Sequence, residues 1–344
     1  MSLSKKVFLY FKDSKRAIVP CYDAEKNLLA RRRLDFLKRN CKSIPKCYLK
    51  NWNSVKLYSP NAEPENASAI LIDKDLGAFD INNSLNELTG KEWTKFTCSW
   101  FIFNALSSDL KQEKELNLST EEHPATFSPT MVSDFIKFFT KTGEVVIDPF
   151  AGIGSTLEAC KRTGRVGYGI ELNKKYYDVI MKRFPEFAKN IYNFDSTKID
   201  LLDLPNIDFS ISSPPYWDVL NRSTDGFKKK REKNGLDVTY SDANDDLGNI
   251  GDYEAFLAKA CEVYEKLFKF MRKGAYLVII VKNVKKNGIL YPLAWDMARK
   301  LGKLYTLKDE KIWIQDKIGL SPYGYPKAWS SNILHHYCLI LRKE

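Results

Sequence analysis

Apolar and polar positions follow different patterns on the two sides of residue 120. Beyond it, short apolar runs of strand length alternate with longer segments whose apolar residues recur every three or four positions. This alternation predicts an α/β domain in which helices connect the strands of a mostly parallel sheet. The predicted strands are EVVIDP (144–149), RVGYGIE (165–171), KNIYNFD (189–195), IDFSISS (207–213) and AYLVIIV (275–281). The predicted helices are STLEACKRT (155–163), KKYYDVIMKRF (174–184), DYEAFLAKACEVYEKLFKFM (252–271) and YPLAWDMARKL (291–301).

Two further extended runs, residues 304–315 and 335–343, follow the last predicted helix. They leave little room for a crossover helix between them, so we predict that they pair in antiparallel fashion at the edge of the sheet. The residues before 118 show mixed short elements and no repeat. We therefore predict two regions, 1–118 and 119–344.

The net charge of +11 is concentrated in the first 60 residues, which hold 15 Lys and Arg against 4 Asp and Glu. A predicted helix in this region carries Arg31, Arg32, Arg33, Lys38 and Arg39. Such a run is either a solvated helix face or the footprint of contact with a phosphate backbone. The same two interpretations apply to a second basic run, which lies in a stretch rich in Asn, Asp and Gly. This second run is Lys228, Lys229, Lys230 and Arg231.

Composition indicates a globular chain, because 44% of the residues are hydrophobic. No apolar run approaches the roughly 20 residues that span a bilayer, and the first residues lack the apolar core of a signal peptide. We therefore expect a soluble, cytoplasmic protein without a membrane partner. The seven cysteines are irregularly spaced, and the nearest pair, Cys41 and Cys47, has no histidine close by. We expect reduced thiols and no metal site.

The ends of the predicted strands carry the polar residues of a candidate site. Asp148, Glu171 and Asp195 each end a strand, and the carboxyl ends of parallel strands meet at one edge of the sheet, where ligands bind. Glu171 follows Asp148 by 23 residues, which is where a carboxylate binds ribose hydroxyls in nucleotide-binding folds. These three positions predict a ligand that contains a ribose.

The turn after Asp148 reduces the number of ligands that fit the site. It contains Gly152 and Gly154, and we expect both to let the backbone approach the ligand where a Cβ atom would clash. The Lys of a phosphate-binding loop is absent, and Leu157 stands where a dinucleotide fold has a third small residue. Asp148 can accept a hydrogen bond from a cationic or amino group. A ligand with a ribose and a positive centre but no pyrophosphate, such as S-adenosylmethionine, fits these features.

The segment after the fourth predicted strand, SPPYW (213–217), indicates the chemistry. Pro214 and Pro215 lack backbone N–H groups, so the carbonyl groups of Ser213 and Pro214 are available as acceptors. Tyr216 and Trp217 offer flat rings on which a base can stack. An amino group on a base is a poor nucleophile because its lone pair is delocalised into the ring. Acceptors at its two hydrogens favour the tetrahedral nitrogen of the transition state.

Three segments together resemble a known family. DPFAGIGST (148–156), SPPYW (213–217) and HPATFSP (123–129) are similar to motifs I, IV and X of the amino-methylating DNA methyltransferases, which form N4-methylcytosine or N6-methyladenine, often in restriction-modification systems. The resemblance covers residues 121–343. It implies a Rossmann-like class I methyltransferase fold, with a mostly parallel seven-stranded sheet and an antiparallel edge strand. It also implies S-adenosyl-L-methionine as cofactor and double-stranded DNA as partner.

The resemblance assigns roles to individual residues. The cofactor-binding residues that it implies are His123, Thr126, Phe127, Asp148, Phe150, Gly152, Gly154, Thr156, Glu171 and Asp195. The catalytic residues that it implies are Ser213, Pro214, Pro215 and Tyr216. The target base must leave the helix stack to reach them. The basic N-terminal region is the first candidate for target recognition, and the stretch between residues 217 and 252 is the second.

Several alternatives remain open. Ser213 is similar to the first motif position of cytosine-N4 enzymes, whereas Asp or Asn is commoner in adenine enzymes, so we predict N4-methylcytosine and keep N6-methyladenine as the alternative. An RNA amino-methyltransferase and a non-catalytic nucleic-acid-binding module are two others. A cognate restriction endonuclease would be a further partner. No Pro-Cys pair follows the fourth strand, so we expect direct transfer without a cysteine nucleophile, and we expect His335 and His336 to pack in their strand.

Overall fold

The computed structural model describes residues 83–103, 127–217, 247–316 and 319–344, together with the backbone of four short strands. These strands are β1 (Val7–Leu9), β2 (Ala17–Val19), β3 (Ala69–Asp73) and β4 (Gly77–Asp80). The predicted site residues His123 and Thr126 lie outside the described residues, as do the two basic runs and the predicted boundary at residue 118. The chain forms two compact units. The first is Met1–Cys98 with Lys137–Thr142, and the second is Ser99–Ile136 with Gly143–Glu344.

The first unit contains two antiparallel strand pairs, β1 with β2 and β3 with β4, and the short helix α3 (Gly90–Phe96). A reciprocal cap begins the helix, because the Thr89 hydroxyl accepts from the Glu92 amide while the Glu92 carboxylate accepts from the Thr89 amide. The Phe96 ring stacks on the Phe138 ring at 4.1 Å between centroids. Local capping and aromatic contacts of Trp93 and Phe96 therefore hold this helix.

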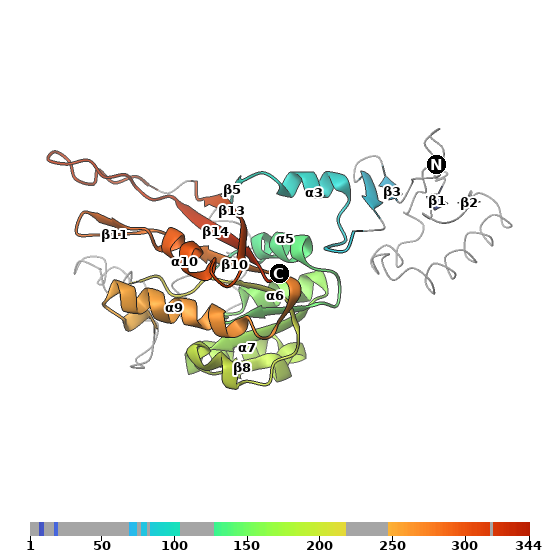
Figure 1. The fold of residues 1–344 in the computed structure, drawn as a ribbon, viewed down its shortest axis with the longest axis horizontal. Helices are drawn as coiled ribbons and strands as arrows, with labels where there is room; N and C mark the ends of the chain where they lie inside the picture. Colours follow the sequence, from blue (N-terminus) through green and yellow to red (C-terminus); the bar gives the residue numbers. More distant parts are fainter. Residues whose placement is uncertain are drawn as a thin grey trace. The chain divides into compact units, whose positions relative to one another are not determined.

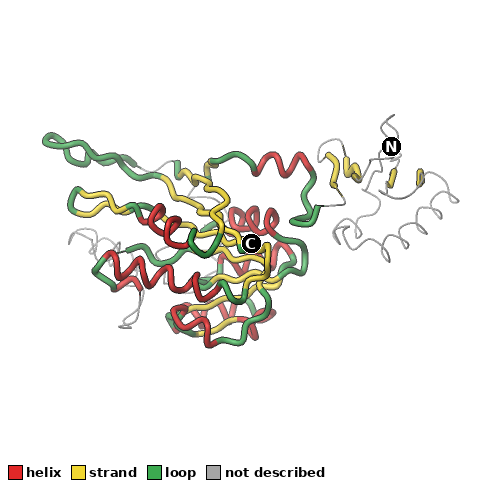
Figure 2. Tube along the Cα trace, in the orientation of Figure 1, coloured by secondary structure: helices red, strands yellow, loops and turns green. Residues whose placement is uncertain are grey.

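The second unit is built on a sheet of eight described strands, seen in Figures 1 and 2. From one edge to the other, they are β5 (Trp100–Ile102), β13 (Thr306–Ile314), β14 (His335–Arg342), β10 (Met271–Val281), β9 (Ile207–Ser212), β6 (Val145–Asp148), β7 (Val166–Glu171) and β8 (Ile191–Asn193). Strand β14 runs antiparallel to both of its neighbours, and the other pairs are parallel. The predicted mostly parallel sheet with an antiparallel pair is confirmed. Strand β5 adds an eighth strand to the predicted seven.

Helices and short hairpins connect these strands. The helices are α5 (Pro129–Phe139), α6 (Ser155–Thr163), α7 (Lys174–Arg183), α9 (Tyr253–Leu267) and α10 (Leu293–Leu301). The 3-10 turns are η3 (Pro185–Asn190), η4 (Ser196–Leu201) and η5 (Leu247–Asn249), and the hairpin is β11 (Val284–Lys286) with β12 (Ile289–Tyr291). No described helix has the length and apolar character needed to cross a membrane.

Two apolar clusters fix the strands in place. The larger one contains buried side chains of α9 and α10 together with β9, β10 and β14, among them Phe256, Tyr264 and Leu277. The smaller one joins α6, α7 and β8 through residues such as Leu157 and Phe184. Burial of these side chains stabilises the sheet and sets the positions of its strand ends. Because β6, β7, β8, β9 and β10 run parallel, their carboxyl ends lie at one edge of the sheet.

Candidate active site

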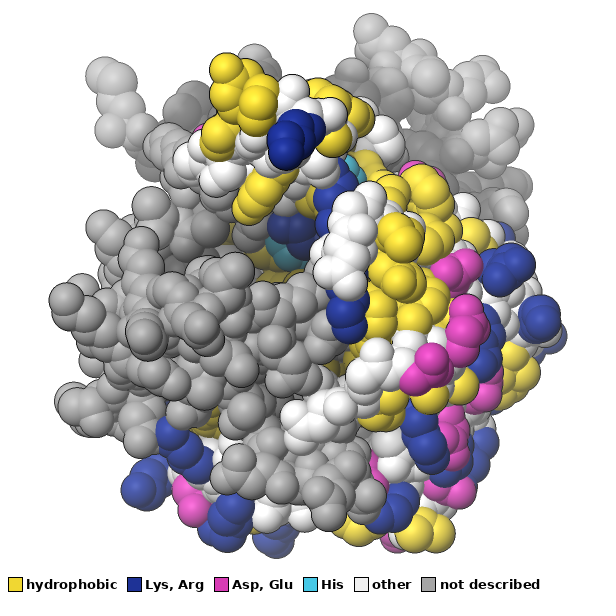
Figure 3. All heavy atoms as spheres, turned by 90° about the vertical axis from the view of Figure 1, so that its left-hand side faces the viewer, with side chains coloured by type: hydrophobic (Ala, Val, Ile, Leu, Met, Phe, Trp, Pro, Cys, Tyr) yellow, Lys and Arg dark blue, Asp and Glu magenta, His cyan; other side chains and the backbone are white. Residues whose placement is uncertain are grey.

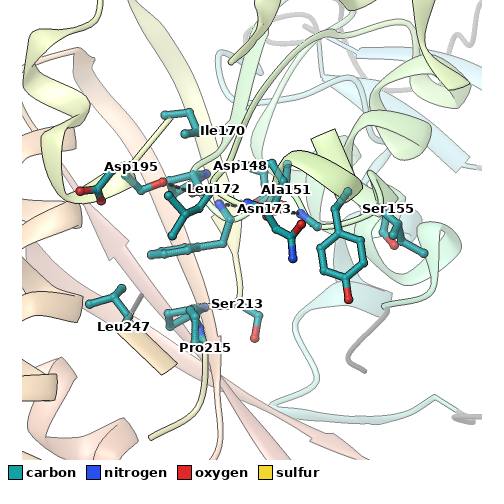
Figure 4. A pocket seen from close by; sticks show the side chains of 18 of the residues that line it. Asp148, Ala151, Ser155, Ile170, Leu172, Asn173, Asp195, Ser213, Pro215 and Leu247 are labelled. Atoms are coloured by element: carbon teal, nitrogen blue, oxygen red, sulfur yellow. Dashed lines mark hydrogen bonds between the residues drawn. The ribbon is translucent and has the colours of Figure 1, made fainter. Parts of the chain in front are cut away.

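A pocket lies at this carboxyl edge (Figure 4). Its walls come from the turn after β6, the end of β7, the start of η4 and the segment after β9. In Figure 4, Asp195 and Ser155 lie at opposite ends of the pocket, Asp148 lies between them, and Ser213 and Pro215 line another wall. The predicted residues that line it are Phe127, Asp148, Phe150, Gly152, Glu171, Asp195, Ser213, Pro214, Pro215 and Tyr216.

Asp148 is buried at the end of β6, with 4% of its surface exposed. One carboxylate oxygen accepts a hydrogen bond from the Phe150 amide at 2.9 Å, and the other accepts from the Thr156 hydroxyl at 2.6 Å. Burial raises the pKa of Asp148 to about 6, although both hydrogen bonds act in the opposite direction. A positive group in the pocket would therefore stabilise this carboxylate in its charged form.

Glu171 shapes the glycine turn. Its Oε2 atom accepts from the Gly152 amide at 2.8 Å, and its Oε1 atom accepts from the Asn173 amide at 2.7 Å. A carboxylate oxygen can accept more than one hydrogen bond, so the same side chain can hold the turn and accept from ribose hydroxyls. Glu171 lines the pocket, and its contact with a ribose stays a prediction.

The two glycines of the turn have different surroundings. Gly152 has φ of 53° and lines the pocket. Gly154 has φ of 92° and is the N-cap residue of α6, and a Cβ atom on it would lie 2.5 Å from a ring carbon of Phe184. We predicted that both glycines let the backbone approach the ligand; in the structure Gly152 lines the pocket and Gly154 does not. Thr156 is also outside the pocket lining, buried behind the Asp148 carboxylate to which it donates.

Asp195 occupies the N-cap position of η4. It accepts hydrogen bonds from the amide and the hydroxyl of Thr197 at 2.9 and 2.7 Å, and its second oxygen lies 3.1 Å from the Lys198 ammonium. Burial acts to raise the pKa of Asp195, but the contacts with Thr197 and Lys198 outweigh it, and the pKa is lowered. The pocket therefore has an ionised acceptor at this end.

The SPPYW segment follows β9, whose last residue, Ser212, is held by a hydrogen bond. The Ser212 hydroxyl lies 2.9 Å from the buried Tyr264 hydroxyl, and the Ser213 hydroxyl donates to the Tyr216 hydroxyl at 3.3 Å. Trp217 does not line the pocket. Its ring is buried, and it packs on the Tyr291 ring at 4.5 Å between centroids. The predicted stacking face is thus Tyr216 alone, because the Trp217 ring is used in packing.

An aromatic chain that the sequence did not indicate joins the two sides of the pocket. The Phe127 ring meets the Trp313 ring edge-on at 6.0 Å, Trp313 stacks on His336 at 4.5 Å, and His336 lies 5.9 Å from the Tyr216 ring. Burial, with smaller contributions from Lys282 and the neighbouring histidine, lowers the pKa of His336 to about 3. His336 is therefore neutral and packs between rings, in agreement with the packing role expected for it.

Sequence reasoning also missed pocket residues that lie just after the predicted strand ends or in the first turns of α6 and α7. The signal that could have found them is this proximity, since a residue next to a strand end shares its edge of the sheet. They include Ser155, Leu172, Asn173, Tyr176, Ser196 and Thr197.

The amino-acid sequence was compared with family models and with known proteins, and it matches one family. The family model described as DNA methylase, of the N6 and N4 type, matches residues 3–182 of the 344. Type II methyltransferase M.ScaI of Streptomyces caespitosus is 29% identical over 79 residues, which cover 23% of this chain and 26% of that protein. Type II methyltransferase M.Cfr9I of Citrobacter freundii is 39% identical over 69 residues, which cover 20% of this chain and 23% of that protein. The chain thus spans about a quarter of the length of these relatives.

Among solved structures, M. capricolum TrmK in complex with S-adenosyl-homocysteine matches with a TM-score of 0.35 and 9% identity, over 64% of this chain and 69% of that one. The methyl donor of the matched family is S-adenosylmethionine. Glu171, Asp195 and Phe127, which the sequence resemblance assigns to its ribose, adenine and methionine parts, all line the pocket. Since the family model covers more than half of the chain, this protein belongs to the DNA methylase family of the N6 and N4 type.

Proposed function

We propose that this protein is a site-specific DNA methyltransferase that transfers a methyl group from S-adenosylmethionine to the exocyclic amino nitrogen of a flipped base. Cytosine N4 is the proposed target atom. The observation that carries the proposal is the shared pocket, in which Asp148 and Glu171 from one side and Ser213 and Pro214 from the other line the same space. A methyl donor and an amino group could meet there directly.

The chemistry of the SPPYW segment supports an amino acceptor. When bound, S-adenosylmethionine supplies an electrophilic methyl group, to which the amino nitrogen bonds while the sulfur keeps the electron pair of the broken bond. The Ser213 hydroxyl and the Pro214 carbonyl can accept from the two amino hydrogens, and Pro214 and Pro215 have no backbone N–H group that would compete with them. These acceptors localise the lone pair on nitrogen, and alignment of the two reactants supplies much of the rate gain.

The residue type at position 213 supports cytosine. A serine hydroxyl can both donate and accept, so its chemistry allows either base, and the support for cytosine is the resemblance, in which Asp or Asn is commoner at this position in adenine enzymes. The Ser213 hydroxyl donates to Tyr216 in the structure, so its oxygen keeps acceptor capacity for an amino hydrogen. A restriction-modification setting, with a cognate endonuclease, is part of the same proposal.

The test is a methylation assay with methyl-labelled S-adenosylmethionine and three substrates: unmethylated plasmid DNA, the same DNA heat-denatured, and total RNA. The DNA is then digested to nucleosides and the product identified by mass. We expect labelled N4-methylcytosine from duplex DNA. N6-methyladenine would overturn the base assignment, and label in RNA alone would overturn the DNA substrate. Retained cofactor binding without transfer to any of the three would overturn the proposed reaction.

A variant pair tests the site itself. Pro214→Ala/Tyr216→Ala should lose transfer while still binding S-adenosylmethionine, because the change restores a backbone donor and removes the stacking ring. Pro205→Ala is the control, since Pro205 lies before β9 and outside the pocket. Transfer by the double variant at the wild-type rate would refute the assignment of the catalytic segment.

A further inference from the structure

Two projections leave the same carboxyl edge of the sheet as the pocket. One is the hairpin of β11 and β12, which follows β10, and the other is the connection from β13 to β14, of which we call residues 319–334 the arm. Strand β13 runs in the direction of β10, because both are antiparallel to β14. Both projections therefore start on the edge that holds the SPPYW segment, and Figures 1 and 2 show them extending from one end of this unit.

The arm presents large apolar side chains to solvent. Tyr325 is 81% exposed and Trp329 is 86% exposed, and Leu320 and Tyr323 are 73% and 58% exposed. A cluster of this kind on one projection marks a binding surface more often than a chance exposure.

The arm is nevertheless an ordered structure. The Asn332 side chain accepts from the Ser321 amide at 3.0 Å and donates to the Ser321 carbonyl at 2.8 Å, which closes its base. At its tip the Ala328 amide donates to the Gly324 carbonyl at 2.6 Å. A Cβ atom on Gly324, whose φ is 84°, would lie 2.3 Å from the Ala328 carbonyl oxygen. The arm thus has hydrogen bonds of its own, while its aromatic side chains are exposed.

Positive charge surrounds the two projections. Residues 282–291 and 319–335 contain four lysines and no Asp or Glu. Lys285 ties the hairpin to the arm, because its ammonium donates to the Ser330 hydroxyl at 3.0 Å and to the Ser331 carbonyl at 2.6 Å. On this face, Figure 3 shows Lys or Arg side chains around a hollow in which a histidine side chain lies. A long anionic partner fits this surface better than a protein surface of mixed charge.

Both projections are anchored beside the pocket. Trp313, at the end of β13, stacks on His336 and meets Phe127, which lines the pocket. On the hairpin, the Lys286 ammonium lies 4.6 Å from the centre of the ring of Trp217, the last residue of the SPPYW segment. A ligand held by the arm and the hairpin would therefore lie next to the catalytic segment.

Resting on the proposed function, we propose that the arm and the β11–β12 hairpin form the surface that grips duplex DNA around the flipped base. Aromatic side chains of the arm enter the duplex, and Lys286 and Lys327 contact its phosphates. A base that leaves the stack leaves a gap between its neighbouring bases, and proteins usually fill such a gap with apolar side chains. The lysines beside the arm supply the attraction to the backbone that does not depend on sequence.

The test measures binding of a fluorescent duplex of random sequence over a range of salt concentrations. Leu320→Ala/Lys327→Gln removes one apolar and one charged side chain from the arm. Leu307→Ala/Lys308→Gln removes the same chemistry from the far end of β13, where Leu307 is 46% exposed. We expect the arm variant to bind more weakly, with a salt slope smaller by about one, and the control to bind as wild type does.

A second variant, Tyr325→Ala/Trp329→Ala, should lower duplex affinity by roughly ten- to a hundredfold, the range expected for loss of base stacking, with unchanged affinity for S-adenosylmethionine. Wild-type binding and methylation by both arm variants would overturn the proposal and leave the proposed function intact. Duplex binding that depends on the arm, in a protein that transfers no methyl group, would uphold the arm and overturn the function. A changed oligomeric state at unchanged DNA affinity would assign the arm to a second copy instead and overturn the proposal.

Discussion

Replacement of Asp148 by Asn should separate the stability of the fold from its affinity for the cofactor. Asp148 is the buried carboxylate of the pocket, and its pKa of about 6 lies above its ordinary value of 3.8. Asn has nearly the same shape and can still accept from the Phe150 amide. The substitution therefore removes the charge and leaves most of the packing in place.

The difference between the folded and unfolded pKa of Asp148 sets how much the free energy of unfolding changes with pH. At 1.36 kcal/mol per pH unit, the raised pKa corresponds to roughly 3 kcal/mol of unfolding free energy. The folded state binds the proton more tightly than the unfolded state, so the stabilising contribution is present below pH 3.8 and is lost as pH rises through 6. The amide that replaces the carboxyl group in the variant has no proton to lose. Between pH 4 and pH 8, the wild type should become less stable relative to Asp148→Asn by about 2 to 3 kcal/mol.

The assay is urea unfolding of both proteins at a series of pH values without cofactor. Asp203→Asn serves as the control, because Asp203 is exposed and outside the pocket. Its unfolding free energy should follow that of the wild type across the range. Parallel curves for the wild type and Asp148→Asn from pH 4 to pH 8 would refute the argument that burial penalises this charge.

Although Asp148→Asn should be the more stable protein at pH 8 without cofactor, the wild type should bind the cofactor more tightly. A positive ligand favours the charged carboxylate, so the wild type should lose affinity for S-adenosylmethionine by up to about tenfold per pH unit below pH 6. Asp148→Asn should bind weakly with little change over the same range. Calorimetric titration at several pH values measures this, and a variant that is more stable at pH 8 yet binds less cofactor cannot be explained by misfolding.

Three further predictions concern single positions. Glu171→Gln should weaken binding of S-adenosylmethionine by about tenfold or more in calorimetric titration, because a neutral amide replaces a charged acceptor, and unchanged affinity would remove Glu171 from the cofactor site. Gly154→Ala should destabilise more than Gly143→Ala in urea unfolding. Both glycines have positive φ, so an alanine at either position should lower the free energy of unfolding by about 1 kcal/mol. Only at Gly154 would the new Cβ atom also clash with Phe184, which should cost about 1 to 3 kcal/mol more. Equal losses of unfolding free energy for the two variants would contradict this. His336→Phe should leave the pH profile of methyl transfer unchanged between pH 5 and pH 8, because His336 is already neutral there, and a displaced profile would contradict it.

The strand ends of the second unit were predictable because the signals are local. A buried strand gives an apolar run in the sequence, and the residue that ends it lies at the ligand edge whatever the distant packing. Asp148, Glu171 and Asp195 were found in this way, and each of them lines the pocket. The antiparallel pair at residues 304–315 and 335–343 followed from the same reasoning, since a short connection excludes a crossover helix.

The features that were missed depend on contacts between distant segments. Strand β5 has three residues, too few for a periodic pattern, and exists because it pairs with β13. Trp217 looked like a stacking face, but Tyr253 and Tyr291 from other elements enclose its ring. Gly154 has the same residue type as Gly152, and only the position of α7 shows that its missing Cβ makes room for Phe184. A sequence gives the chemistry of a side chain, whereas packing decides which face of it remains available.

Packing around the titratable side chains of the pocket also determines how the proposed reaction would depend on pH. A methylated exocyclic amine is a strong acid until it loses a proton, so water suffices as the acceptor and no side chain near the amine has to act as a base. Ser213 and the Pro214 carbonyl, the groups proposed to hold the amine, do not titrate near neutral pH. Asp195 is held ionised by Thr197 and Lys198, and His336 is held neutral by burial. Asp148 lines the pocket and its pKa is raised to about 6, so acid loss of activity should follow cofactor binding and disappear when the cofactor is saturating.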